Sequence, residues 1–299
     1  MPLSGLVKLR SFLLKSVSLS LIARRAVMVW CLGSALSVLL NFAGCTRTRR
    51  ADPSSNRSTP RNYTNAQAEL DKYWQNAKTE VDKSAWELMG QHQAELEKGI
   101  KYRKFMRGDP SKRQVAITFD DGPHPAYTPK LLAILKDFSV KATFFVVGEK
   151  AEQAPNLVKA EVAAGHNVGN HTFHHVNLTK IPDEKIETEI KACGDVIRHI
   201  TGQAPHLFRP PGGDYNDRVA RDAVALGYVI ILWTDDPGDY ASPGDRIIET
   251  RLLDRISNGG IILIHDGVQQ TIDVLPQILK YLKAKGYQFV TIDQMMGGS

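Results

Sequence analysis

The chain has 299 residues, a formal net charge of +6, 42% hydrophobic residues and three cysteines. This composition is close to that of an average globular protein, so it excludes a wholly disordered chain, a collagen and a multi-span membrane protein. Three cysteines are too few for a disulfide scaffold. The positive charge raises the question of an acidic partner such as nucleic acid, and the answer depends on where the charge lies.

The positive charge lies toward the N-terminus. Residues 1–44 carry five basic side chains and no acidic one, and residues 46–109 carry 13 basic and 9 acidic side chains. Residues 110–299 carry 20 basic and 23 acidic side chains, so this part of the chain is slightly acidic. It also contains no nucleic-acid-binding motif, and we therefore expect no nucleic-acid partner.

Residues 1–44 predict an export signal. Arg24 and Arg25 precede 18 uncharged residues, 26–43, and the pattern of a basic region, an apolar region and small residues is typical of a secretory signal. The segment from Phe42 to Cys45 resembles a bacterial lipobox, in which the cysteine becomes lipid-modified. We expect an exported lipoprotein of the bacterial cell envelope, anchored in the membrane through Cys45. An uncleaved signal anchor and simple secretion are the alternatives.

Two accessory segments follow the signal. Residues 45–65 are rich in Arg, Ser, Thr, Asn and Pro and predict a flexible tether. Residues 66–108 predict an amphipathic helical segment, because apolar residues from Leu70 to Leu88 recur at three- and four-residue spacing with Lys and Glu between them. Packing of this helix on the following domain is favoured, and pairing with a second copy or docking to a partner are the alternatives.

Residues 109–299 predict one α/β domain. Apolar runs typical of buried strands alternate with helical patterns, which indicates a parallel sheet covered by helices. The expected strands are 114–119, 142–147, 166–170, 206–209, 228–232, 261–265 and 287–292. The expected helices are 128–138, 149–164, 183–201, 216–226, 244–257 and 272–285. Seven such units favour a closed or nearly closed (β/α) barrel, with a doubly wound sheet as the alternative.

Polar residues gather where these strands end, and the first two groups suit a metal site. Asp120 and Asp121 end the first strand, and adjacent carboxylates stay ionised only where a cation or a donor compensates their repulsion. His171 and His175 have the spacing with which one helical turn can hold a metal ion, whereas His174 is expected to point elsewhere. One carboxylate and two imidazoles leave coordination positions open, as on a catalytic Zn²⁺.

Two further groups lie later in the chain. The loop from Arg209 to Tyr215 contains two prolines and two glycines, which suit a rigid loop whose N–H groups approach a ligand, although a surface turn has the same composition. The last group combines the segment 233–240 with His265, which ends a strongly apolar strand. Beside the other polar groups, a functional His265 is favoured over a core histidine. Cys193 is expected to be a buried apolar residue.

Together these motifs, in this order from residue 112 to 299, resemble the polysaccharide deacetylase family, the NodB-homology domain of carbohydrate esterase family 4. The resemblance implies a distorted (β/α)7-type barrel. It implies that Asp120 is the catalytic base and His265 the general acid. It further implies that the metal ligands are Asp121, His171 and His175, and it assigns the residues that support the base and the acid as Arg209 and Asp239, with Asp236 less favoured than Asp239.

The resemblance extends to substrate residues. The backbone N–H of Gly212 is expected to bind the oxyanion, and the side chains expected near the substrate are Tyr215, Trp233 and Tyr240. Gly212 stands where an aromatic residue is usual, and Tyr240 stands where tryptophan is common. The second difference bears on the pocket for the acetyl methyl group, and hence on substrate preference.

The function implied is metal-dependent removal of N-acetyl groups from a polysaccharide that contains N-acetylglucosamine, either peptidoglycan or an exopolysaccharide. The metal expected is Zn²⁺, with Co²⁺ or Ni²⁺ as alternatives. An O-acetyl esterase acting on acetylated xylan or another glycan, and a catalytically inactive glycan-binding module, are the competing interpretations. The sequence leaves the polymer and the oligomeric state open.

Overall fold

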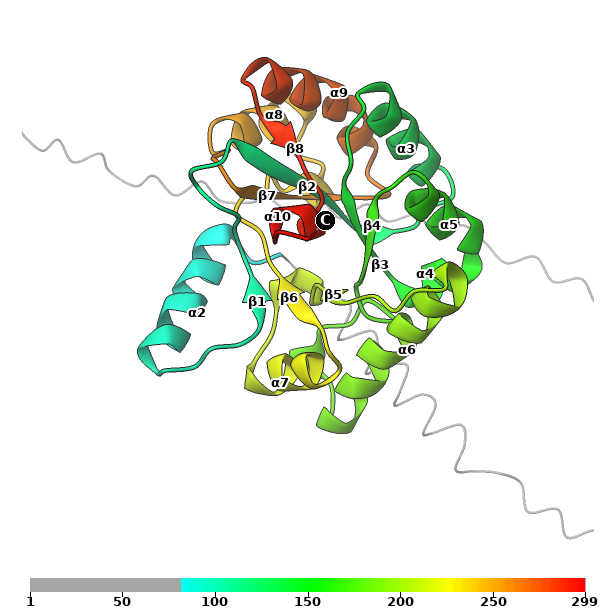
Figure 1. Cartoon of the computed structure of the whole chain (residues 1–299), viewed down its shortest axis with the longest axis vertical. Helices are drawn as coiled ribbons and strands as arrows, with labels where there is room; N and C mark the ends of the chain where they lie inside the picture. The colour runs from blue at the N-terminus through cyan, green and yellow to red at the C-terminus, as the bar shows by residue number, and fades with distance from the viewer. Residues whose placement is uncertain (1–81, 299) are drawn as a thin grey trace, which may run out of the picture. The chain divides into compact units, whose positions relative to one another are not determined.

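The structure is a computed structural model that describes residues 82–298 (Figure 1). These residues belong to one compact unit. The expected signal at 1–44, its lipid site at Cys45, the tether at 45–65 and the first part of the helical segment lie outside the described residues. Within 82–298, every helix is too short or too polar to cross a bilayer.

In the described part of the chain, eight short strands form one sheet whose neighbouring strands all run parallel. Their order is β1-β6-β5-β4-β3-β2-β7, and β8 also pairs with β2. An isolated parallel bridge between Asp235, which follows β6, and Ile262 links the β6 side of the sheet to β7, the strand at its other end. The strands are β1 Lys104–Phe105, β2 Gln114–Gly122, β3 Thr143–Val146, β4 Asn167–Asn170, β5 Leu207–Phe208, β6 Val229–Ile231, β7 Gly260–His265 and β8 Gln288–Phe289.

Helices surround this sheet (Figure 1), and the predicted (β/α) barrel is confirmed. The expected helix 149–164 is divided in two, because Ala154 is not helical (φ −134°, ψ 55°) and Pro155 begins a new helix after it. The helices are α2 Ala85–Glu97, α3 Thr128–Asp137, α4 Gly148–Gln153, α5 Pro155–Ala163, α6 Asp183–Thr201, α7 Asp217–Ala225, α8 Asp245–Leu253, α9 Gln269–Ala284 and α10 Ile292–Met295. Three single turns of 3-10 helix are Leu178–Lys180, Pro211–Gly213 and Asp239–Ala241.

The alternation of side chains along β2 determines which of its residues face the inside of the barrel. Val115, Ile117 and Phe119 belong to the apolar cluster that includes residues of α3 and α9, whereas Ala116 belongs to the cluster inside the barrel. Because successive strand residues point to opposite faces, Asp120 shares the inner face with Ala116. The strand therefore delivers a buried carboxylate to the carboxyl end of the barrel.

The region before residue 109 differs from the expected helix. The helix α2 ends at Glu97, because Gly99 follows with a positive φ of 74°, a conformation that ends helices. Lys104 and Phe105 then form β1 and pair with β6, so the sheet begins before residue 109. The favoured packing of the helix on the domain is confirmed, since Leu88 is fully buried in the inner apolar cluster.

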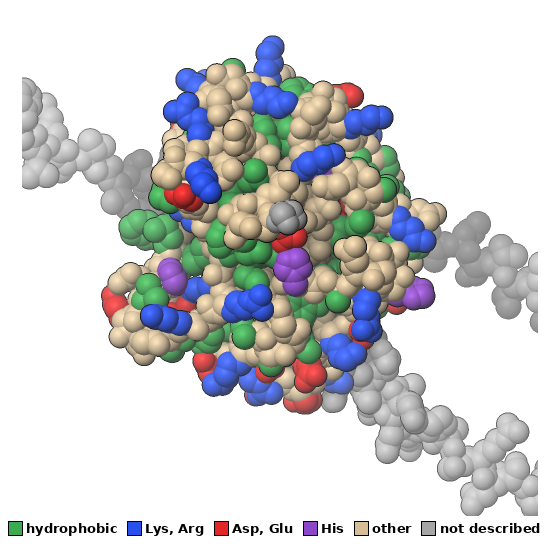
Figure 2. Space-filling model, in the orientation of Figure 1, with side chains coloured by type: hydrophobic (Ala, Val, Ile, Leu, Met, Phe, Trp, Pro, Cys, Tyr) green, Lys and Arg blue, Asp and Glu red, His purple; other side chains and the backbone are tan. Residues whose placement is uncertain are grey.

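The short helix α10 covers the amino end of the barrel. The backbone N–H groups of Ile292 and Asp293 donate to the side chains of Thr143 and Asn167, the first residues of β3 and β4, at 3.0 and 3.1 Å. Figure 1 shows α10 within the ring of strands. Figure 2 shows this same side of the molecule, where Lys and Arg side chains are spread around the edge and form no continuous patch. The polar residues at the carboxyl ends of the strands lie at the opposite end.

Candidate active site

The end of β2 brings two consecutive carboxylates to one place. Adjacent residues of a regular strand point to opposite faces, but Asp121 has a positive φ of 69°, and the pairing with β3 shifts register between Phe119 and Gly122. Both carboxylates consequently approach the same imidazole. His171 Nε2 lies 3.7 Å from Asp120 Oδ2 and 3.5 Å from Asp121 Oδ1.

His171 and His175 lie in a loop after β4, so the expected helical turn is wrong. The Asn170 side chain accepts a hydrogen bond from Thr172 N at 2.9 Å, and both Thr172 and His175 have positive φ angles, 64° and 55°. This tight local bend competes with a helix and still brings the two rings together, with centroids 5.0 Å apart. His174 points elsewhere as expected, with its Nδ1 2.7 Å from Glu189 Oε1.

Asp121, His171 and His175 form a group suited to a metal ion. Their donor atoms all lie within 4.8 Å of one another, and His175 Nε2 is 3.0 Å from Asp121 Oδ1. His171 Nδ1 lies 2.7 Å from the Arg209 carbonyl and donates to it, which leaves Nε2 with a free lone pair. Asp121 Oδ1 is buried, and both imidazole Nε2 atoms lie within 3.5 Å of it. Two nitrogens and one oxygen that converge in this way fit a divalent ion such as Zn²⁺.

The charge of Asp121 agrees with this fit. Burial alone would raise the pKa of its carboxyl, but the neighbouring His175 and His171 outweigh burial and hold the pKa well below its usual value. Asp121 is therefore ionised at neutral pH, as a metal ligand must be.

Asp120 is held by a buried arginine. Arg209 Nη1 donates to Asp120 Oδ1 and to Thr118 Oγ1, both at 2.7 Å, and its Nε donates to the Ile231 carbonyl at 3.2 Å. The guanidinium group lies 4.2 Å from the centre of the Phe145 ring. These contacts fix the Asp120 carboxylate in one orientation.

His265 is paired with Asp239, as expected. Its Nδ1 lies 2.7 Å from Asp239 Oδ1, and its backbone N donates to Asp239 Oδ2 at 2.8 Å. Burial alone would lower the pKa of His265, but the charge and the hydrogen bond of Asp239 raise it well above the usual 6.5. Asp236, the less favoured candidate, instead accepts a hydrogen bond from Gly238 N at 2.7 Å.

The expected substrate residues are not all brought together. Tyr240 lies beside His265, with ring centroids 5.6 Å apart, and Gly212 has a positive φ of 64° in the loop after Arg209. Trp233 is buried, and the centre of its ring lies 5.5 Å from the Arg209 guanidinium. Its ring therefore packs beside the arginine that holds Asp120. Tyr215 is also buried, and its hydroxyl accepts a hydrogen bond from Lys104 Nζ at 2.9 Å. Among the described residues, no contact links Tyr215 to Asp121, His171 or His175.

One residue at this site was not expected. Asp82 Oδ2 lies 3.4 Å from His265 Nε2, on the opposite side of the ring from Asp239. Nothing in the sequence distinguishes Asp82, because it is one of several charged residues in a stretch with a helical pattern.

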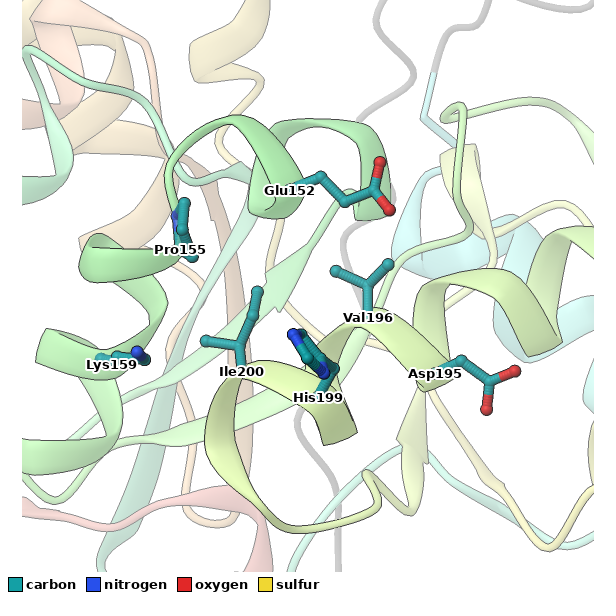
Figure 3. Close-up of a pocket in the computed structure, with 7 residues that line it drawn as sticks. All are labelled: Glu152, Pro155, Lys159, Asp195, Val196, His199 and Ile200. Atoms are coloured by element: carbon teal, nitrogen blue, oxygen red, sulfur yellow. The ribbon is translucent and has the colours of Figure 1, made fainter.

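A separate hollow of about 520 Å³ lies between α4, α5 and α6 (Figure 3). The Val196 and Ile200 side chains line the space between the helices, whereas the carboxylates of Glu152 and Asp195 point outward (Figure 3). None of the expected site residues lines it. The chemistry suggested by the motifs is therefore concentrated at the carboxyl end of the barrel.

Comparison with known proteins agrees with this arrangement. The profile of the family described as "Polysaccharide deacetylase" matches residues 107–231. A peptidoglycan-N-acetylglucosamine deacetylase of Bacillus cereus is 40% identical over 191 residues, which cover 62% of this chain and 89% of that protein. The chain therefore belongs to the polysaccharide deacetylase family, carbohydrate esterase family 4.

Solved structures show the same fold. The crystal structure of the Bc1960 peptidoglycan N-acetylglucosamine deacetylase matches with a TM-score of 0.65 and 35% identity, covering 69% of this chain and 97% of that one. BA3943 from Bacillus anthracis, described as a pseudoenzyme of carbohydrate esterase family 4, matches with a TM-score of 0.62 and 29% identity, covering 66% of this chain and 70% of that one. Membership of the family therefore defines the fold and the class of chemistry, and activity depends on the site residues of each chain.

Proposed function

We propose that this protein is a metal-dependent polysaccharide N-deacetylase that releases acetate from N-acetylglucosamine units. The observation that carries the proposal is the convergence of Asp121, His171 and His175 next to Asp120 and His265. Each group has a place in hydrolysis of an amide: a cation site, a base for the attacking water and an acid for the leaving nitrogen.

The base in this proposal is Asp120. A divalent ion held by Asp121, His171 and His175, with Zn²⁺ favoured over Co²⁺ or Ni²⁺, would polarise the acetamide carbonyl and make the attacking water more acidic. Asp120 accepts the proton of that water as its oxygen bonds to the carbonyl carbon. Arg209 keeps the Asp120 carboxylate in place for this step through the hydrogen bond at 2.7 Å.

The acid in this proposal is His265. Asp239 binds Nδ1 and keeps the ring protonated, so that Nε2–H can donate to the sugar nitrogen as the C–N bond breaks. The products are acetate and a free amine on the sugar. Without the proton, the leaving group would be an amide anion, and the tetrahedral intermediate would return to substrate.

The oxyanion that forms on the carbonyl oxygen needs a donor. Pro210 and Pro211 have no N–H, so Gly212 carries the first N–H after Arg209 in this loop. Its positive φ and lack of a side chain allow its backbone to approach a substrate closely. We assign the oxyanion donor to Gly212 N–H and a contact with the acetyl group to Tyr240, which lies beside His265.

The proposed substrate is bacterial peptidoglycan. Support comes from the relative whose name states that substrate and from the export signal expected at residues 1–44. An exopolysaccharide rich in N-acetylglucosamine is the second candidate. Membrane attachment through Cys45 would place the domain next to the cell wall. We do not favour an inactive glycan-binding module, because this chain has every residue that we propose as base, acid and metal donor, and these residues lie close together.

The experiment that tests the proposal is an assay of acetate release by the purified protein. Peptidoglycan, N-acetylglucosamine oligomers and acetylated xylan should be compared at equal concentrations of acetyl groups. The proposal predicts release from the first two and little from xylan. Release from xylan alone would indicate the O-acetyl esterase instead, and release from none of them would indicate the binding module.

A further inference from the structure

The residues just before α2 lie across the proposed active site. We call Asp82, Lys83 and Ser84 the Asp82–Ser84 strap. Asp82 Oδ2 is 3.4 Å from Nε2 of His265, and the Asp82 side chain is 14% exposed. His265 thus lies between two carboxylates, with Asp239 at Nδ1 and Asp82 at Nε2.

The strap is held by the loop that carries Gly212 and by Trp233. Lys83 N donates to the Gly212 carbonyl at 2.9 Å, and Trp233 Nε1 donates to the Lys83 carbonyl at 3.2 Å. The Lys83 ammonium group pairs with Asp214 at 2.7 Å. Ser84 caps α2, which packs on the barrel through Leu88. The position of Asp82 therefore follows from several contacts of the two residues that come after it and from the packing of α2.

The two carboxylates beside His265 have different consequences. Asp239 binds the nitrogen that faces away from the reaction and so leaves Nε2 to act. Asp82 faces Nε2 itself, which must come within about 2.6–3.2 Å of the leaving nitrogen to transfer its proton. A carboxylate and an amide substrate cannot both occupy that position. The observed arrangement is consequently one in which the acid is engaged by the protein's own chain.

We propose that Asp82 competes with substrate for His265, so that the Asp82–Ser84 strap must release Nε2 before a sugar can be deacetylated. This inference rests on the proposed function, in which His265 is the proton donor. A substrate that binds only the released state shows an apparent affinity reduced by the fraction of molecules in that state. The strap continues directly into the segment that joins the domain to the predicted anchor, so its release is open to control from that side.

The test uses the full-length chain and the substitutions Asp82→Asn and Asp82→Ala. Asn retains the shape but loses the charge, and Ala removes the competing group. Both are expected to lower KM for an N-acetylglucosamine oligomer by roughly three- to ten-fold, the effect of losing one partly buried ion pair, while kcat stays within about two-fold. Asp137→Asn, which removes an exposed carboxylate at the end of α3, is the control and should change neither constant.

The proposal is tested by whether the Asp82 substitutions change KM while kcat stays nearly constant. An unchanged KM in both variants, or a fall in kcat of ten-fold or more, would overturn the proposal, since the second result would make Asp82 part of the catalytic machinery. A second measurement does not require turnover: modification of His265 by diethyl pyrocarbonate, followed by mass spectrometry of its peptide. We expect modification at least three-fold faster in Asp82→Ala than in the parent chain.

This second measurement separates the two hypotheses. If neither the parent chain nor Asp82→Ala releases acetate from any substrate, the proposed function fails. Faster modification of His265 would then still support the blocking contact, and an equal rate would overturn it.

Discussion

Arg209 Nη1 lies 2.7 Å from Asp120 Oδ1, and both side chains are buried at the carboxyl end of the barrel. The pair connects β2 with the loop after β5, so two strands that are not neighbours in the sheet share one charged contact. The same loop supplies the Arg209 carbonyl to His171 Nδ1. One residue therefore positions both the proposed base and a proposed metal ligand.

Removal of the base should separate chemistry from metal binding. Asp120→Asn is expected to lower kcat by about 10²–10⁴-fold, because the amide cannot accept the proton of the attacking water. Bound metal, measured by plasma mass spectrometry, should remain near the parent value. Asp121→Asn is the matched comparison, and it should lose most of the metal. Loss of metal in Asp120→Asn would show that Asp120 is itself a ligand.

Removal of the arginine should affect stability as well as activity. Arg209→Met leaves the buried Asp120 carboxylate without its partner, and we expect a loss of about 3–5 kcal/mol in the free energy of unfolding. Urea unfolding followed by circular dichroism measures this loss. The double variant with Asp120→Asn should recover part of it, because the unpaired charge is gone. A double variant no more stable than Arg209→Met would contradict the pairing.

The pH dependence of activity should report the His265–Asp239 pair. Asp239 raises the pKa of His265, so the ring stays protonated to a higher pH and its donated proton is lost only as the pH rises through the raised value. Asp239→Asn should therefore move the alkaline limb of the kcat/KM profile to lower pH and lower kcat by about 10²-fold. Acetate release measured from pH 5 to 10 tests this. An alkaline limb that does not move would assign it to another group.

The helix α2 should be an integral part of the folded domain. Leu88→Ala removes a fully buried side chain from the inner cluster, and we expect a loss of about 2–5 kcal/mol in the free energy of unfolding. Trp86→Ala, two residues earlier on the same helix, is the control, because that ring is 82% exposed and its removal should cost less than about 0.5 kcal/mol. Equal stability of Leu88→Ala and the parent chain would indicate a loosely attached helix.

The sequence pattern predicted most of the barrel because its strands are buried on both sides. A strand such as β7, with every residue from Gly260 to His265 buried, must be apolar throughout, and such runs are visible in a single sequence. The strand β1 escaped prediction, since Lys104 and Phe105 are only two residues and pair at the edge of the sheet. Their strand conformation depends on β6, not on local pattern.

The sequence also predicted which strand ends supply the residues of the candidate site, but not the conformation of the loops or the contacts between distant residues. Residues that end strands, such as Asp120 and His265, were found because chain position alone brings the ends of parallel strands together. The conformation between His171 and His175 was mistaken, since the spacing of two histidines is satisfied by a helical turn and by a tight loop alike. The contacts of Tyr215 and Asp82 could not be predicted, because their partners, Lys104 and His265, are more than a hundred residues distant in sequence.

The most direct measurement of the central claim is acetate release from N-acetylglucosamine oligomers by the full-length protein before chelation, after chelation and after addition of Zn²⁺. The account predicts that release stops when the metal is removed and returns when Zn²⁺ is restored, and that His171→Ala fails to recover at the same concentration. Release that continues undiminished in the chelated protein would contradict it.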